Sequence, residues 1–222
     1  MAGIKIKSAF RKDFYESEAW AAGKTVVGVD EVGRGCLAGP VVAAAVILPP
    51  GTRSPLLRDS KQLGEAELEK AFAWIIKRTR FSVGIIPSWI IDEVNIYRAT
   101  QCAMSRACAG LLSVSGGSDV AAILIDAMPL GTGEGFPPVY YFIKGESKSR
   151  SIAAASIVAK VTRDRIMRNL GELFEPYYFA EHKGYGTEKH RGAVERSGRS
   201  IIHRFSYGDF SEEIDEQISL FG

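Results

Sequence analysis

Short apolar runs rich in β-branched residues recur along most of the chain and predict the strands of a sheet. Each run is bounded by glycine, proline or charged residues, which is typical of strands buried in a core. The predicted strands are residues 25–30, 40–48, 81–86, 120–125 and 139–143. Only eight residues separate Asp30 from Gly39. This is too few for a parallel crossover, so the first two strands should be antiparallel neighbours.

Longer stretches carry apolar residues at the spacing of a helix. In the first of them Leu68, Phe72 and the pair Ile75/Ile76 fall on one face. The predicted helices are residues 63–77, 90–112 and 151–169. Three early strands, followed by two strands interleaved with helices, indicate an α/β fold with a mixed five-stranded sheet flanked by helices.

The order of these elements divides the chain into three predicted parts. Residues 1–24 form an N-terminal segment, residues 25–175 the α/β domain, and residues 176–222 a small C-terminal helical extension packed on that domain. A length of 222 residues suits one large domain. The sequence contains no internal repeat and no long linker.

The composition is that of an ordinary globular protein, with 46% hydrophobic and 24% charged residues. No apolar run approaches the roughly 18 residues of a membrane span, and residues 1–13 lack the apolar core of a secretory signal. The three cysteines, Cys36, Cys102 and Cys108, show neither a CxxC pair nor metal-ligand spacing. This usage suits a reducing compartment. We therefore expect a cytoplasmic monomer that does not contact a membrane.

Charge is distributed unevenly along a chain whose net charge is only +2. Residues 144–204 contain 13 Lys and Arg against 7 Asp and Glu, whereas residues 205–222 contain five acids and no Lys or Arg. A basic stretch of this kind fits a polyanionic partner such as nucleic acid. It fits a solvated face beside an acidic tail equally well, and charge alone does not distinguish the two.

Three acids stand at the ends of predicted strands. Asp30 and Glu31 close the first strand, and Asp126 closes the fourth. Active sites of open α/β sheets gather at strand carboxyl ends, so these acids converge if the two strands are neighbours. Successive side chains on a strand point to opposite faces. Asp30 and Glu31 therefore share one site only if the backbone departs from strand geometry, which Gly33 and Gly35 would permit.

Asp164 is a fourth candidate, inside the third predicted helix. An apolar stripe precedes it on the same helix face and should pack on the sheet. The stripe consists of Ala153, Ile157 and Val161. An unpaired buried carboxylate would be costly, so Asp164 should meet a cation or lie at the rim of a cleft. A surface ion pair with Lys160 or Arg168, one turn away, also fits the spacing.

A cluster of three or four carboxylates without His or Cys ligands favours hard cations such as Mg²⁺ or Mn²⁺. Two such ions, about 4 Å apart, activate a water and stabilise the leaving oxygen of a phosphodiester. For any one of these acids, the alternative is a helix cap or an exposed ion pair. His182, His190 and His203 share no ligand spacing, and we assign none of them to a metal.

An ordered set of motifs covers most of residues 25–207. They are GVDEVGRGCLAGPVVAAAVILP from residue 28, DSKQL from 59, IDEVNIYRAT from 91, LIDAMP from 124, KGESKS from 144, SIAAASIVAKVTRDRIM from 151, HKGYGT from 182 and IHRFS from 202. In this order they closely resemble the ribonuclease HII family in its bacterial form, although GRG or DE alone would be a weak signal. The resemblance implies an RNase H-like fold. It also implies a metal-dependent endonuclease that hydrolyses the RNA strand of RNA/DNA hybrids and cuts 5′ to ribonucleotides embedded in duplex DNA.

The resemblance implies that Asp30, Glu31, Asp126 and Asp164 are the catalytic, metal-binding acids, which their positions also select. It further implies a group that reads the junction between a ribonucleotide and the DNA that follows it. Glycine backbone can approach a 2′-OH closely, and an aromatic ring can stack on a sugar or base. The junction-reading group is Gly33, Arg34, Gly35 and Tyr185. Without the resemblance, two turn glycines, an exposed cation and a packed aromatic ring would describe them as well.

Further candidate substrate contacts are Lys61, Asn95, Lys144, Ser147, Lys148 and His182. Two positions depart from the family pattern. Ala127 stands where glycine commonly follows the third acid, and a positive φ there would add strain of about 1 kcal/mol. Glu146 replaces the more usual Asp, and we expect no consequence. The terminal ISLFG is a degenerate candidate for contact with a sliding clamp.

Three other interpretations compete with this one. Gly33, Gly35 and Gly39 follow a strand as in a nucleotide-binding oxidoreductase, but such a site needs a helix after the glycines, whereas residues 40–48 read as a strand. A non-catalytic nucleic-acid-binding module on the same fold predicts missing acids, and all four are present. Another nuclease of the RNase H superfamily, such as a junction resolvase or an integrase, is opposed only by the GRG motif and Tyr185.

Overall fold

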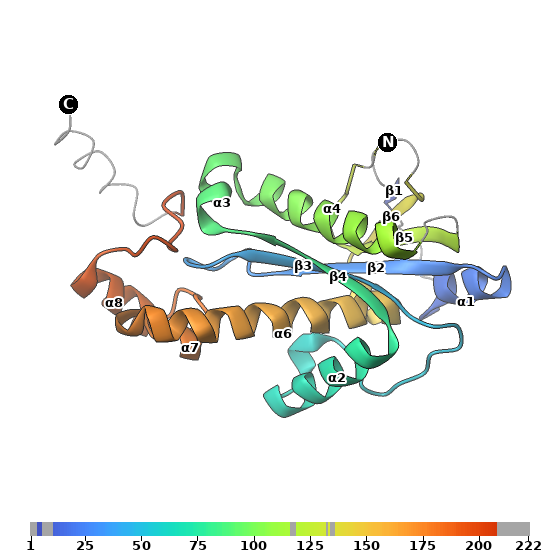
Figure 1. Ribbon diagram of the computed structural model, residues 1–222, viewed down its shortest axis with the longest axis horizontal. Helices are drawn as coiled ribbons and strands as arrows, with labels where there is room; N and C mark the ends of the chain where they lie inside the picture. The colour runs from blue at the N-terminus through green and yellow to red at the C-terminus, as the bar shows by residue number, and fades with distance from the viewer. Residues whose placement is uncertain (1–3, 6–10, 116–118, 132, 134–135, 208–222) are drawn as a thin grey trace.

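A mixed six-stranded sheet with helices on both faces forms the centre of the molecule (Figure 1). The computed structural model describes residues 4–5, 11–115, 119–131, 133 and 136–207. The elements are β1 (Ile4–Lys5), α1 (Phe14–Ala21), β2 (Thr25–Val32), β3 (Val41–Ile47), η1 (Ser60–Gln62), α2 (Glu65–Arg78), β4 (Arg80–Ile86), α3 (Ser88–Val94), α4 (Ile96–Ser115), β5 (Val120–Asp126), β6 (Val139–Phe142), α5 (Gly145–Lys148), α6 (Arg150–Leu173), η3 (Glu175–Tyr177), α7 (Phe179–His182) and α8 (Glu188–Ser197).

The strand order across the sheet is β1-β6-β5-β2-β3-β4. All five predicted strands are present, and the predicted antiparallel pairing of β2 with β3 is confirmed. β2 is also parallel to β5, and β5 is parallel to β6. The two-residue strand β1 extends the sheet beyond the five predicted strands, pairing with the outer edge of β6. The central position of β2, with β5 beside it, is what places the candidate acids.

Two helical layers enclose the sheet, with α3 and α4 over one face and α2 and α6 over the other (Figure 1). The predicted helix faces are largely confirmed. In α2, Leu68, Phe72 and Ile75 are buried, whereas Ile76 is 37% exposed. The apolar stripe of α6 packs in the core as expected; it consists of Ala153, Ile157 and Val161, all buried.

Two helical predictions need correction. The stretch predicted as one helix over 90–112 is two helices, α3 and α4, because Asn95 between them has a φ of 68° that no helix accommodates. The helix α1 was not predicted, since its apolar residues do not define a clear face. No helix in the described ranges is long and apolar enough to cross a membrane.

The segment after α6 packs back on the C-terminal half of that helix. Met167 of α6 lies in one apolar cluster with Phe179 of α7 and Val194 of α8. The rings of His182, His190 and His203 adjoin this cluster. The division of the chain at residues 24 and 175 remains a prediction.

Candidate active site

Adjacent parallel strands bring three of the candidate acids to one edge of the sheet. β2 pairs with β5 as far as Val29 and Ile125. Asp30 and Glu31 of β2, and Asp126 of β5, follow directly after these last paired residues. The structure therefore places the three acids together.

The backbone at Asp30 and Glu31 stays in strand geometry, contrary to the departure we expected. Both residues are paired with β3 in the antiparallel ladder, so their side chains leave opposite faces of β2. Asp30 shares its face with Gly28, where a Cβ would lie 2.0 Å from the backbone of Ser151 in α6. The two carboxyl groups still interact, since the charge of Glu31 contributes to the raised pKa of Asp30.

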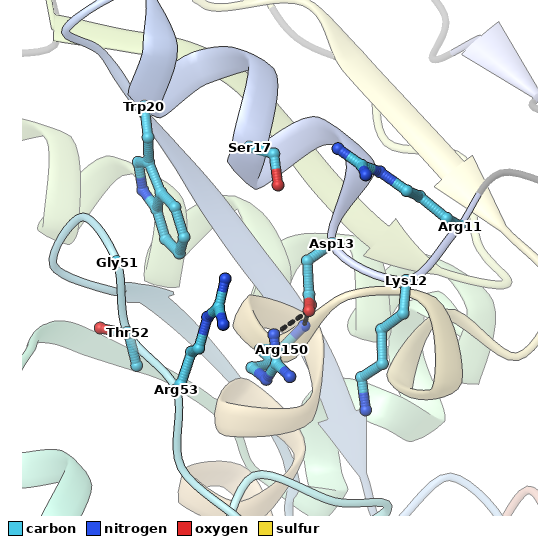
Figure 2. A pocket seen from close by; sticks show the side chains of 9 residues that line it. All are labelled: Arg11, Lys12, Asp13, Ser17, Trp20, Gly51, Thr52, Arg53 and Arg150. Atoms are coloured by element: carbon cyan, nitrogen blue, oxygen red, sulfur yellow. Dashed lines mark hydrogen bonds and ion pairs between the residues drawn. The ribbon is translucent and has the colours of Figure 1, made fainter.

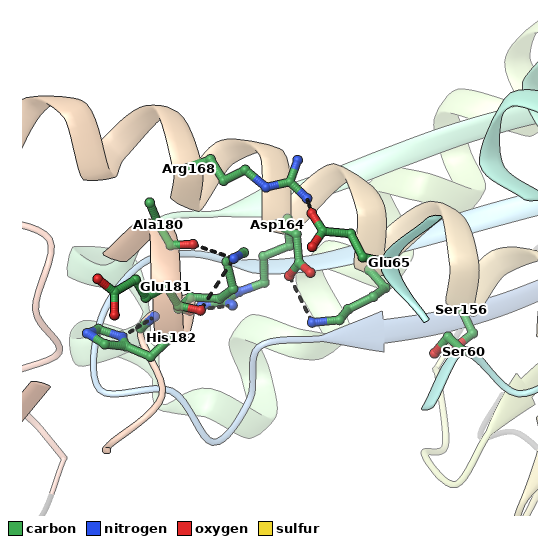
Figure 3. A network of polar contacts seen from close by, with 12 residues as sticks. Ser60, Glu65, Ser156, Asp164, Arg168, Ala180, Glu181 and His182 are labelled. Carbon is green, nitrogen blue, oxygen red and sulfur yellow. Dashed lines mark hydrogen bonds and ion pairs between the residues drawn. The ribbon is translucent and has the colours of Figure 1, made fainter. Parts of the chain in front are cut away.

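Asp30 is the most buried of these three acids, at 8% exposure. Its Oδ1 accepts the N–H of Glu31 at 2.8 Å. Its carboxyl group is also hydrogen bonded to Ser156 of α6, whose Oγ lies 2.8 Å from that of Ser60 (Figure 3). These bonds favour the ionised form. Burial, followed by the charge of Glu31, outweighs them and raises the pKa of Asp30 to about 8.

The other two carboxyl groups are also held in an unfavourable environment. Burial, followed by a hydrogen bond with Glu146, raises the pKa of Asp126 to about 7, although Gly145 N donates to Asp126 Oδ1 at 2.7 Å. Burial raises the pKa of Glu31, and the Arg34 guanidinium, 3.5 Å from Glu31 Oε1, opposes that rise. The cluster therefore resists full ionisation near neutral pH.

The turn after Asp126 adopts the conformation that glycine favours. Ala127 has a φ of 52°, and its N–H donates to Phe142 O at 2.5 Å. The condition set for strain at this position is therefore met, and the methyl group of Ala127 adds about 1 kcal/mol at the edge of the site.

Glu146 is a site residue that the sequence did not reveal. It is only 9% exposed, it is hydrogen bonded to Asp126, and its charge acts on both Asp126 and Asp30. The expectation that Glu in place of Asp has no consequence stays a prediction, but the side chain itself belongs to the site. The KGESKS motif gave its residue type, but only the position of α5 beside the end of β5 shows where the side chain lies.

The donor set at this edge fits a hard divalent cation. All of its groups are carboxylates, the ligands that Mg²⁺ and Mn²⁺ prefer. Glu31 Oε2 and Glu146 Oε2 are buried and have no hydrogen-bond partner within the described part of the chain. In that same part, no three His, Cys, Asp or Glu side chains are already grouped closely enough to hold a metal. A cation would offset the cost of burying these carboxylates and their mutual repulsion, which together raise the pKa values.

Asp164 lies apart from this cluster. It follows Ser156 by eight residues, which corresponds to about 12 Å along the axis of α6. Its Oδ1 accepts a hydrogen bond from Lys160 Nζ at 2.9 Å, the ion pair that its spacing also allowed. Figure 3 shows Asp164 near Arg168 of α6 and Glu65 of α2, which are 2.7 Å apart. With these two residues it lines a small cavity of about 100 Å³ between the helices.

A buried arginine fixes the glycine-rich loop after β2. Arg204 is fully buried and donates to three carbonyl oxygens of the loop. They are those of Gly33 at 2.6 Å, Arg34 at 2.9 Å and Gly39 at 2.9 Å. The guanidinium carries five N–H groups in a rigid fork, which suits it to hold several carbonyl oxygens at once. Among the described residues it has no carboxylate partner, so its bonds to these carbonyls set the shape of the loop.

A second buried arginine ties this loop to the one that carries Tyr185. Arg163 of α6 donates to Pro40 O at 2.9 Å, Ala38 O at 3.1 Å and Lys183 O at 2.8 Å. Cys36 and Tyr185 also form an isolated antiparallel bridge. The structure therefore brings together the four residues assigned to junction reading, although they are some 150 residues apart in the chain.

The two glycines of GRG differ in what they require. Gly33 has a φ of 93°, and a Cβ there would lie 2.2 Å from Nε of Arg163. Gly33 is therefore a turn glycine. Gly35 has no such φ, is exposed, and a Cβ there would meet nothing within 4 Å. The fold does not explain Gly35, which leaves its backbone open to a ligand.

Tyr185 and Arg34 flank this open backbone. Tyr185 is 41% exposed, and its ring lies over the Arg163 guanidinium at 5.9 Å. Arg34 forms an ion pair with Glu31, so it links the glycine loop to the carboxylate cluster. Neither residue is simply a packed aromatic or a free surface cation.

The basic candidates near the cluster lie on two short elements. Lys144 and Lys148 belong to the α5 corner beside Asp126, and Ser147 Oγ donates to Lys144 O at 2.8 Å. Lys61 is exposed on η1, next to the Ser60 that bonds Ser156. Lys61, Lys144 and Ser147 are exposed, whereas Lys148 is half-buried with its ammonium 5.7 Å from the centre of the Phe142 ring.

The remaining two candidates have structural contacts. Asn95 Oδ1 accepts the N–H of Arg98 at 3.1 Å and so caps α4. His182 Nε2 is bonded to Tyr177 O at 2.7 Å, and its ring stacks on His190 at 4.4 Å between centroids. These contacts favour structural roles for both side chains.

Comparison with known proteins places the chain in a family. The family model described as Ribonuclease HII matches residues 27–209. Ribonuclease HII of Levilactobacillus brevis is 45% identical over 194 residues, which are 87% of this chain and 72% of that protein. Ribonuclease HII of Bacillus thuringiensis strain Al Hakam is 47% identical over 204 residues, which are 91% of this chain and 76% of that protein.

Solved structures agree on the fold. Ribonuclease H2 from Pyrococcus horikoshii OT3 has a TM-score of 0.65 at 24% identity, over 88% of this chain and 99% of that one. Bst-RNase HIII in complex with Mn²⁺ has a TM-score of 0.68 at 19% identity, over 87% and 70%. At these identities the likeness concerns the fold alone, and it confirms the predicted RNase H-like architecture. With the family match over most of the sequence, these findings show that the chain belongs to the ribonuclease HII family, a family of endonucleases.

Proposed function

We propose that this protein is an endoribonuclease that hydrolyses the RNA strand of RNA/DNA hybrids. It also cuts 5′ to ribonucleotides embedded in duplex DNA, leaving a 3′-hydroxyl and a 5′-phosphate. The observation that carries this proposal is the pairing of two features on one edge of the sheet. A cluster of buried carboxyl groups lies there beside an exposed glycine backbone, which is held in place by Arg163 and Arg204.

The cluster would hold Mg²⁺ or Mn²⁺ through Asp30, Glu31 and Asp126. Such a cation activates water and stabilises the charge that develops on the leaving oxygen. Glu146, whose buried Oε2 has no partner in the described part of the chain, would complete this set. Asp164, which lies apart from the cluster and is paired with Lys160, would act from the rim on the substrate rather than as a ligand of the same cation. Burial of Asp30 strengthens every electrostatic contact at this edge.

Recognition of the ribonucleotide rests on the loops beside the cluster. The exposed backbone of Gly35 is free to approach a 2′-OH, the group that distinguishes RNA from DNA. The exposed ring of Tyr185 is placed to stack on the following sugar. Gly33 shapes the loop, and Arg34 connects it to Glu31.

The α5 corner and η1 supply cations for the phosphates around the cut. We assign this role to Lys61, Lys144 and Lys148, with Ser147 as a further donor. Asn95 and His182 support the surrounding loops instead. A sliding-clamp contact through the terminal ISLFG stays a proposal, and this segment lies outside the described residues. A cytoplasmic location and a monomeric state are also proposals.

Other superfamily nucleases and a non-catalytic module are less well supported. Identity of 45–47% over most of the chain is to ribonuclease HII proteins, and all four acids are present.

A substrate comparison tests the proposal. A DNA duplex with one embedded ribonucleotide should be cut on its 5′ side in Mg²⁺ or Mn²⁺, and Asp30→Asn should abolish the cut. Cleavage of DNA lacking the ribonucleotide, or full activity of Asp30→Asn, would contradict it.

A further inference from the structure

A second cavity lies away from the carboxylate cluster, between the N-terminal segment, the loop after β3 and the start of α6. It measures about 450 Å³. An adjoining cavity of about 460 Å³, lined by residues 54–58, shares Lys12 and Arg150 with it. We call these two adjoining cavities together the basic groove.

Positive charge dominates this groove. Arg11, Lys12, Arg53 and Arg150 line the first cavity (Figure 2), and the only acid among its lining residues is Asp13. Asp13 is already ion-paired with Arg150 and also accepts its backbone N–H at 2.9 Å. The structure gives Arg11, Lys12 and Arg53 no ion-pair partner within the described residues.

The backbone next to Arg11 and Lys12 is anchored to the start of α6. Asp13 N donates to Lys148 O at 2.7 Å. The buried carboxylate of Glu16 in α1 accepts hydrogen bonds from the Ser149 hydroxyl and from Ser151 N. Both anchors lie where α5 passes into α6, the same corner that carries Glu146. Because this backbone is already fixed, binding a ligand in the groove costs less conformational entropy.

An indole ring forms one wall of the groove. Figure 2 shows the indole of Trp20 at the wall of the cavity, across from Arg53. Its Nε1 is shielded from water and makes no hydrogen bond in the described part of the protein. The donors that the groove presents to a ligand are therefore its cationic side chains.

The helix α6 sets the groove in line with the active site. Three residues mark positions along α6. Arg163 lies against the ring of Tyr185, Ser156 interacts with Asp30, and Arg150 lines the groove. Arg150 precedes Ser156 by six residues, or about 9 Å along the helix axis. Since one strand of a duplex advances about 3.4 Å per nucleotide, that span equals two to three nucleotides.

We propose that the basic groove binds the sugar-phosphate backbone of the duplex on the 5′ flank of the cut, without taking part in the chemistry. The inference rests on the proposed function, which places Tyr185 on the 3′ side of the cut. The groove lies on the opposite side of the carboxylates along α6. Its cations contact phosphates and so add affinity without reading sequence.

The test uses a triple variant, Arg11→Ala, Lys12→Ala and Arg53→Ala, which leaves the Asp13–Arg150 anchor intact. The matched control, Lys70→Ala, Lys77→Ala and Arg80→Ala, removes three exposed cations from α2 and β4. Binding to a non-cleavable duplex is measured by fluorescence anisotropy over a range of salt. The groove variant should bind about tenfold more weakly at low salt. The slope of log K against log salt should fall by about 2 to 3, because each phosphate contact contributes about 0.9.

Two cleavable substrates separate this inference from the proposed function. In one, the duplex extends well upstream of the single ribonucleotide; in the other, both strands end two nucleotides upstream of the cut. The groove variant should process the short substrate as the wild type does and lose affinity only for the long one. Equal binding of the long duplex by the groove variant and the wild type would overturn the inference, as would an equal loss in the control variant. If the wild type cuts neither substrate, the proposed function itself fails.

Discussion

The carboxylate cluster and the glycine-rich loop lie side by side, but they differ in how well the protein satisfies their polar groups. In the cluster, like charges are buried together, their pKa values are raised, and oxygens of Glu31 and Glu146 lack partners in the described chain. In the loop, Arg204 and Arg163 satisfy one backbone carbonyl after another. One region is electrostatically strained, and in the other two buried arginines bond the backbone carbonyls that fix the loop.

The difference matches what each region has to bind. A site for a cation gains affinity when its carboxylates are incompletely neutralised by the protein. A site that recognises the shape of a sugar gains selectivity when its backbone is already fixed. Substitutions that remove charge from the cluster, or that loosen the backbone of the loop, test this comparison.

Loss of the Arg204 guanidinium should give the largest effect on stability. Arg204→Leu leaves several buried carbonyl oxygens without donors, and we expect the free energy of unfolding to fall by about 3 kcal/mol in a urea titration. Arg204→Lys keeps the charge but not the fork of donors, and should recover only part of the loss. Wild-type stability in Arg204→Leu would show that the loop does not depend on this residue.

The carboxylate cluster and the pair of buried histidines in and beside α8, His190 and His203, should respond to pH in opposite directions. Burial lowers the pKa of His203 to about 4 and also lowers that of His190, against about 6.5 in the unfolded chain. As pH falls from about 6.5 to 4, the unfolded state takes up protons that the folded state refuses. This part of the molecule should lose on the order of 2 kcal/mol.

The carboxylate cluster gives the opposite slope. Asp30 has a folded-state pKa of about 8, above its unfolded value. Its neutral form is therefore favoured by folding at low pH, and this stability is lost as pH rises from about 4 through 8. When unfolding is measured without metal between pH 4.5 and 8.5, the free energy of unfolding of Asp30→Asn should rise relative to that of the wild type as pH rises. Parallel curves for the two proteins would refute this electrostatic account.

The two glycines of GRG should separate stability from recognition. Gly33→Ala meets Arg163 and a positive φ, so it should cost about 2 kcal/mol in thermal unfolding. Gly35→Ala should leave stability within about 0.5 kcal/mol. It should nevertheless lower cleavage at a single ribonucleotide about tenfold, because the added methyl blocks the approach of the substrate. Normal cleavage by Gly35→Ala would remove this glycine from the recognition surface.

Ala127 offers the smallest test. Its φ of 52° costs an L-residue about 1 kcal/mol. Ala127→Gly should therefore raise the midpoint of thermal unfolding by a few degrees and leave cleavage nearly unchanged. A lower midpoint would mean that the methyl group packs favourably.

Periodicity predicted the strands and most helix faces because each depends on neighbours close in sequence. It also selected Asp30, Glu31 and Asp126, since acids that end adjacent strands meet at one edge. It missed the role of Glu146, which depends on where α5 lies, and it left the position of Asp164 open between two alternatives. Arg163 and Arg204 were unmarked in the sequence, because their carbonyl partners lie up to 171 residues away.

Calorimetric titration of Mn²⁺ into the wild type and Asp30→Asn, at pH 7 in buffers of different ionisation enthalpy, tests the central claim most directly. If the cluster is strained by its own charge, the wild type binds Mn²⁺ and releases protons as its carboxyl groups ionise. Asp30→Asn should bind far more weakly and release fewer protons. Equal affinity in the two proteins, or binding without proton release, would contradict the account.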